Sequence, residues 1–152
     1  MKKIICILGV TFLFISCKEA NLSVSQHIAV AQEHPISIEY KAFSRGYFMA
    51  IFVDENIIKK YNDHTLKEFD SKKCSQKDWD LILHYLDTIT LEKIAELSVP
   101  SNKSSLDKKA QAQLKITSGT EVYTSISFDH GYPPAELKLL IDTILALTKN
   151  MK

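Results

Sequence analysis

The chain has 152 residues, enough for one domain with a hydrophobic core, and 45% of its residues are hydrophobic. Its 19 basic and 18 acidic side chains nearly balance, so it lacks both the basic field of a nucleic-acid-binding protein and an acidic tail. Four glycines and four prolines exclude collagen-like and low-complexity chains, and three cysteines are too few for a dense disulfide scaffold. We therefore expect a globular protein that binds no nucleic acid.

Residues 1–16 have the pattern of an export signal. Lys2 and Lys3 precede a nearly unbroken apolar run from Ile4 to Ile15. As a helix this run would rise about 18 Å, which is too short for a hydrocarbon core of roughly 30 Å. The run is therefore typical of a signal peptide and not of a transmembrane helix. Removal of residues 1–16 takes away two lysines and changes the formal charge from +1 to −1.

The apolar run ends in Ile15-Ser16-Cys17, and the polar pair Lys18-Glu19 follows at once. Ile15-Ser16-Cys17 resembles the end of the lipobox of bacterial lipoproteins. The resemblance implies that Cys17 is lipidated and that the chain is cut before it. The alternative is an ordinary cleaved signal in which Cys17 has no special role. Two or more acyl chains give stable anchoring, so the resemblance implies a protein held at a membrane surface by its lipid.

Residues 17–35 are expected to be the lipidated cysteine and a tether, because the stretch from Ala20 to His34 shows neither a clean strand pattern nor a capped helix. Residues 36–152 are expected to form a single domain, because no repeat or shift in composition divides them. Alternating or β-branched and aromatic stretches predict strands at 36–42, 47–53, 57–61, 110–116 and 122–128. Residues 65–73 are either a further, more polar strand or a connection.

Two amphipathic stretches predict helices. Ser75 is a candidate N-cap with Asp78 three residues later, and an apolar stripe runs from Trp79 to Leu86. The second stretch follows the pair Pro133-Pro134 and continues to residue 148, with a short helical turn also expected after Thr90. The order β-β-β-α-β-β-α predicts an α+β fold, an antiparallel sheet with helices packed on one face.

Arg45 and Tyr47 are candidate binding residues. Arg45 is the only arginine, and it lies at an expected hairpin tip beside Tyr47 and Phe48. Arginine and tyrosine are favoured in binding hot spots, so this tip is a possible contact surface. The alternative is a solvated turn residue with Phe48 in the core.

Asp129 and His130 are the second candidate pair. Adjacent residues in a strand point to opposite sides, so they do not automatically form a catalytic pair. The preferred interpretation is structural, with both residues in a turn that leads into Gly131. The functional alternative is that they take part in binding. Cys74 is a candidate nucleophile, but it directly precedes a capped helix, where a small half-buried residue is ordinary.

The five histidines show no metal-binding pattern. No two of them are spaced i, i+4 on an expected helix, and no Cys-x-x-Cys pair accompanies them. We expect no dedicated metal site, no catalytic residue and no cofactor.

The lipobox and three further strings together resemble a family of small, uncharacterised lipoproteins of the Bacteroidota. The strings are Arg45-Gly46-Tyr47-Phe48, Lys73-Cys74-Ser75 with Asp78-Trp79, and residues 127–134. The resemblance implies a lipid-anchored protein of the cell envelope, at the outer membrane, on its periplasmic or its outer side. It supplies no catalytic residues.

The preferred hypothesis for function is a membrane-anchored, non-enzymatic binding or envelope-accessory module that contacts a protein or a glycan. One alternative is a small hydrolase or thiol-dependent enzyme that uses Cys74 or Asp129 and His130. Another is an inhibitor of a host or rival hydrolase that presents the hairpin around Arg45 and Tyr47.

Overall fold

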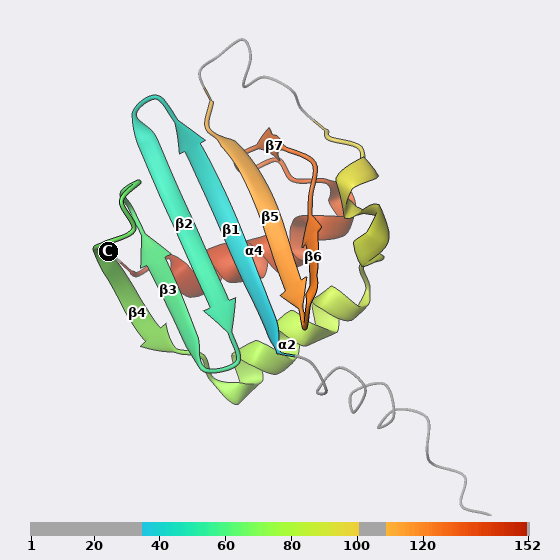
Figure 1. Cartoon of the computed structure of the whole chain (residues 1–152), viewed down its shortest axis with the longest axis horizontal. Coiled ribbons are helices and arrows are strands. Elements are labelled where there is room, and N and C mark those ends of the chain that lie inside the picture. The colour runs from blue at the N-terminus through green and yellow to red at the C-terminus, as the bar shows by residue number, and fades with distance from the viewer. Residues whose placement is uncertain (1–34, 101–108, 152) are drawn as a thin grey trace, which may run out of the picture. The chain divides into compact units, whose positions relative to one another are not determined.

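The alternating stretches of the sequence form one antiparallel sheet (Figure 1). The structure is a computed structural model that describes residues 35–100 and 109–151; the expected signal peptide, Cys17 and all but the last residue of the expected tether lie outside these residues. The sheet order is β4-β3-β2-β1-β5-β6, and β7 also pairs with β5. The strands are β1 (Ile36–Ser44), β2 (Tyr47–Asp54), β3 (Ile57–Tyr61), β4 (Phe69–Lys73), β5 (Gln111–Ser118), β6 (Glu121–Thr124) and β7 (Phe128–Asp129).

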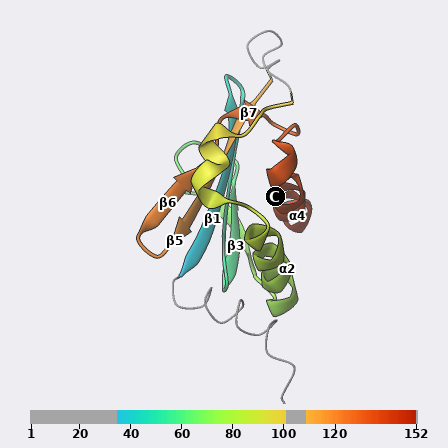
Figure 2. The same cartoon turned by 90° about the vertical axis from the view of Figure 1, so that its right-hand side faces the viewer.

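The helices cover one face of this sheet, as predicted. Figure 2 shows α2 (Gln76–Asp87) and α4 (Lys138–Thr148) on the same side of the strands. The side chains of the central strands that point to this side are almost fully buried, and they include Tyr40, Ile51 and Leu114. The fold is therefore α+β, with a single layer of helices against an antiparallel sheet.

Helix α2 begins where its sequence predicts. Ser75 Oγ accepts a hydrogen bond from the Asp78 backbone N at 3.2 Å, and it donates one to Asp78 Oδ2 at 2.7 Å. These bonds satisfy a backbone donor of the first turn, and Asp78 adds negative charge at the positive end of the helix. The expected stripe is buried at Trp79, Ile82 and Leu86.

The chain contains more elements than the expected order. The polar segment 65–73 ends in a strand, β4, at the edge of the sheet. The helical turn after Thr90 is a 3-10 helix, η1 (Leu91–Glu96), and a second one, η2 (Ala135–Leu137), precedes α4.

The expected strand over 122–128 was wrong in its continuity, because it breaks at Ser125. The Ser125 side chain takes a place in the strand ladder: Leu114 N donates to Ser125 Oγ at 3.0 Å, while Ser125 N donates to Leu114 O at 2.8 Å. The next amide, of Ile126, donates to the carbonyl of Ile94 in η1. The chain rejoins the sheet at β7, opposite Gln111 and Ala112.

Candidate functional site

The face of the sheet opposite the helices carries a row of aromatic side chains. In β2 the outward positions hold Phe48 and Phe52, and the neighbouring strands add Tyr61 and Phe69. The Phe52 and Tyr61 rings meet edge to face with centroids 5.5 Å apart, and the Tyr61 and Phe69 rings lie 5.2 Å apart. Both spacings are favourable for aromatic pairs. Strand β2 is therefore apolar on both faces, although helices cover only one of them.

The loop between β3 and β4, residues 62–68, folds onto this aromatic row. The His64 ring lies 4.3 Å from the Phe48 ring, and Phe48 is only 7% exposed even though no helix covers it. Asp63 holds the loop, since its Oδ1 accepts hydrogen bonds from the Thr65 backbone N at 2.7 Å and from the Thr65 hydroxyl. Leu66 follows with φ of 53°, a left-handed conformation that is unfavourable for leucine. The hydrogen bonds around Asp63 thus maintain a strained residue next to the rings.

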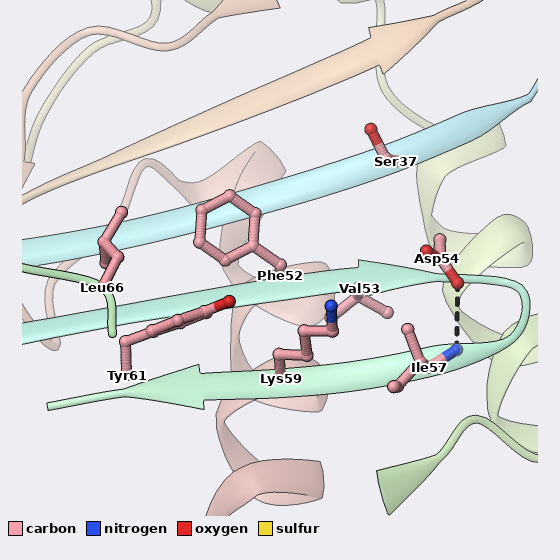
Figure 3. Close-up of a pocket in the computed structure, with 8 residues that line it drawn as sticks. All are labelled: Ser37, Phe52, Val53, Asp54, Ile57, Lys59, Tyr61 and Leu66. Carbon is pink, nitrogen blue, oxygen red and sulfur yellow. Dashed lines mark hydrogen bonds between the residues drawn. The ribbon is translucent and has the colours of Figure 1, made fainter. Parts of the chain in front are cut away.

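An open groove of about 260 Å³ lies between this loop and the β2–β3 turn. Figure 3 shows Leu66, Phe52 and Tyr61 toward one end and Ser37, Asp54 and Ile57 toward the other. Lys59 and Val53 complete its lining. Asp54 Oδ1 accepts hydrogen bonds from the backbone N of Asn56 at 2.8 Å and of Ile57 at 2.9 Å, so the carboxylate is fixed in place. The groove combines an apolar floor with a carboxylate, a hydroxyl and an ammonium group.

Lysines on this face lie over aromatic rings. Lys59 Nζ is 5.1 Å from the centroid of the Phe69 ring, and Lys41 Nζ is 5.5 Å from that of Phe48. Such cation–π contacts are worth about 0.5–1 kcal/mol at exposed sites. Neither lysine has a carboxylate within 4.0 Å among the residues that the structure describes, whereas Glu39 on the same face is paired with Lys115. The open face is therefore both aromatic and cationic.

A second cluster lies on the helix side of the sheet, where β1 turns into β2. The Tyr40 hydroxyl is 2.7 Å from His130 Nδ1, and the Tyr47 hydroxyl is 3.5 Å from His130 Nε2. Tyr40 is fully buried, and its hydroxyl has no other hydrogen-bond acceptor among the residues that the structure describes. We infer that Tyr40 donates to Nδ1 and that the neutral histidine carries its proton on Nε2.

Burial sets the ionisation of this cluster. It raises the pKa of Tyr40, to which the nearby Tyr47 and Asp142 also contribute, and it raises the pKa of Tyr47. Burial lowers the pKa of His130, because a charged imidazolium is poorly solvated there. At neutral pH the three side chains are therefore uncharged, as the hydrogen-bond arrangement requires.

The structure brings together two of the four binding residues that the sequence suggests. Tyr47 and His130 are in contact, with ring centroids 5.7 Å apart. Asp129 is buried in β7, and its carbonyl accepts a hydrogen bond from Tyr132 N, as in the expected turn. Arg45 is exposed in the turn between β1 and β2.

Cys74 lies far from this cluster. Its backbone N donates to the carbonyl of Asn56 in the β2–β3 turn, while His130 meets Tyr47 at the opposite end of β2. A strand of that length spans roughly 20 Å or more. The thiol is buried, and burial raises its pKa, which disfavours the nucleophilic thiolate.

The groove residues Phe52, Tyr61 and Leu66 are absent from the candidates that the sequence suggests. The sequence contained part of the evidence for them, because residues 47–53 are apolar at odd and at even positions. A strand that helices cover on one face only requires apolar side chains on that face, so the second apolar face indicated a further contact surface. The contribution of Leu66 depends on the fold of loop 62–68, which has no comparable pattern.

Comparisons of the chain with models of protein families, with curated proteins and with solved structures found no match. Within residues 35–100 and 109–151, no group of three or more His, Cys, Asp or Glu side chains is placed to hold a metal ion. None of the helices in these same ranges is long and apolar enough to span a membrane.

Proposed function

We propose that this protein is a lipid-anchored binding module of the cell envelope, and that the groove on the open face of the sheet is its binding surface. The observation that carries the proposal is the groove itself. Aromatic rings that neither α2 nor α4 covers meet a fixed carboxylate and the ammonium group of Lys59, which has no carboxylate partner within residues 35–100 and 109–151. Apolar surface combined with a few placed polar groups is the usual composition of a ligand site.

Two features support binding and not catalysis. The groove contains one carboxylate, Asp54, which is bound by two amides of its own turn, and it contains neither a second carboxylate nor a histidine or cysteine, the groups that most often form acid–base and nucleophilic pairs. The titratable cluster at His130 is on the other face of the sheet, where the residues around it are occupied by their own hydrogen bonds.

The lipid anchor rests on the sequence Ile15-Ser16-Cys17. We expect the intact mass of the membrane-extracted protein to be that of a chain beginning at Cys17 plus acyl groups. The variant Cys17→Ala should lose the acyl groups and leave the membrane fraction after alkaline washing, because the acyl groups are the proposed anchor. The matched control is Cys74→Ala, which should stay in the membrane fraction. Unmodified Cys17 in the wild-type protein would contradict the proposal.

The binding surface is tested by co-sedimentation with envelopes. Full-length lipidated protein in detergent micelles is mixed with detergent-washed envelopes of the source cell, so that the acyl chains do not contribute. We expect Tyr61→Ala to reduce the bound fraction about tenfold or more, because truncation of a central aromatic contact costs about 2 kcal/mol. Leu139→Ala, an exposed position on α4, is the control and should bind as the wild type does. Equal sedimentation of the Tyr61→Ala variant and the wild type would overturn the proposal.

A further inference from the structure

The polar groups around the groove define the chemistry of its ligand. Asp54 offers carboxylate oxygens as acceptors, Lys59 is a donor, and the Ser37 hydroxyl is both. Toward the other end of the groove lie the Phe52 and Tyr61 rings, which offer apolar surface. A sugar ring presents C–H groups on its face and hydroxyl groups around its edge. It therefore matches a groove with aromatic rings at one end and hydrogen-bonding groups beside them toward the other end.

The charge of the open face adds a second constraint. Its outward strand positions carry four lysines and two partly exposed carboxylates, besides the buried carboxylate of Asp129 in β7. The lysines are Lys41, Lys59, Lys73 and Lys115, and the partly exposed carboxylates are Glu39 and Asp54. Glu39 is already paired with Lys115, and Asp54 binds the amides of its own turn. The face thus has an excess of positive charge, although the chain without residues 1–16 has a formal charge of −1.

From these two observations we propose that the groove binds an acidic glycan. One sugar ring lies against the aromatic end of the groove, at Phe52 and Tyr61, and acidic substituents of the chain meet Lys59 in the groove and Lys41 on the neighbouring strand β1. This assignment rests on the proposed function and specifies its ligand.

Other occupants fit the same surface less well. A second copy of the chain would place two cationic faces against each other. An alkyl chain of a lipid would cover Asp54 and Ser37 without giving them hydrogen bonds, which is unfavourable. A peptide of acidic residues would meet the lysines, and its main-chain N–H groups could bind Asp54, but it has no apolar ring face to lie against Phe52 and Tyr61.

Calorimetric titration of the full-length protein in neutral detergent tests the proposal. The probes are oligosaccharides of pectate, hyaluronan and chondroitin sulfate, and the methyl ester of the pectate oligomer, which keeps the sugar rings and loses the charge. We expect at least one acidic oligosaccharide to bind. Esterification should weaken the binding of the pectate oligomer about tenfold, if that oligomer is the one bound, and added salt should weaken the binding of every acidic probe.

Two groove variants separate the roles of the rings and of the charge. Tyr61→Ala should weaken the acidic oligosaccharide about tenfold or more, and Lys59→Gln should weaken it severalfold and reduce its salt dependence. The controls are Tyr132→Ala and Lys77→Gln, an exposed tyrosine and an exposed lysine outside the groove, and they should bind as the wild type does. Circular dichroism of each variant confirms its fold, and Lys59→Gln changes only a surface group.

Three results would overturn the assignment. One is the absence of binding to every acidic oligosaccharide while Tyr61-dependent envelope binding persists, and the binding-module proposal would then stand with another ligand. The second is equal or tighter binding of hexaglutamate or of phosphatidylglycerol vesicles, which would indicate a peptide or a lipid surface. The third is unchanged oligosaccharide affinity in both groove variants, which would place the sugar elsewhere on the molecule.

Discussion

Replacing Leu140 by alanine is expected to lower the free energy of unfolding by about 3 kcal/mol or more, whereas the same change at Leu139 should cost less than about 1 kcal/mol. The two leucines are neighbours in α4, but Leu140 is 0% exposed and Leu139 is 59% exposed. Loss of the buried side chain removes contacts between the helix and the sheet and leaves a cavity. Loss of the exposed one removes neither.

Urea denaturation followed by circular dichroism measures both variants under one set of conditions. Because the substitution and the helix are the same, differences in helix propensity cancel, and the comparison isolates burial. Equal destabilisation of the two variants would show that α4 does not pack on the sheet through the face that contains Leu140.

The stability of the domain should fall in mild acid through the protonation of His130. Burial holds the pKa of this histidine below its ordinary value of 6.5, so the unfolded chain binds the proton more readily than the folded one. The contribution to stability is therefore complete above about pH 6.5 and is lost as pH falls through the lower pKa of the folded state. One proton gives a slope of at most about 1.4 kcal/mol per pH unit.

The physical reason is the poor solvation of a buried imidazolium, and protonation also disrupts the hydrogen bond with Tyr40. Once protonated, His130 donates from both nitrogens, and the buried Tyr40 hydroxyl loses its acceptor. His130→Asn retains an acceptor near the position of Nδ1 and has no titratable group.

Unfolding free energies of the wild type and the His130→Asn variant at pH 7.5, 6.5, 5.5 and 4.5 test this expectation. The wild type should lose more stability than the variant over this range, so the difference between them isolates His130 from carboxylates elsewhere. His84→Asn, a change at an exposed histidine on α2, is the control and should keep the acid loss of the wild type. Parallel pH curves for the wild type and the His130→Asn variant would contradict the expectation.

The sequence predicted the class of the fold because its strongest patterns are local. Alternation in 36–42 and the capped stripe from Ser75 to Leu86 depend on contacts within one element, and both appear in the structure. The break at Ser125 was not predictable in the same way. The break depends on the Ser125 side chain, which accepts the hydrogen bond of the Leu114 amide in place of a backbone carbonyl. It also depends on the Ile126 amide, which donates to the carbonyl of Ile94, a residue distant in the sequence.

The candidate site shows the same limit. Tyr47 and His130 are separated by 83 positions, and only the pairing of β1 with both β2 and β5 brings them together. The groove forms only with the observed register of β2 with β3 and with loop 62–68 folded onto the sheet. The alternation of apolar and polar residues specifies neither of these features.

The position of β1 in the sheet has a mechanical consequence. It is the first strand of the domain along the chain, and it lies between β2 and β5, with eight residue pairs on each side. A pulling force at Ile36 that acts along the strand must shear two antiparallel ladders together and cannot open one pair at a time. A protein held by its N-terminal end thus takes load on the most firmly bonded strand of its sheet.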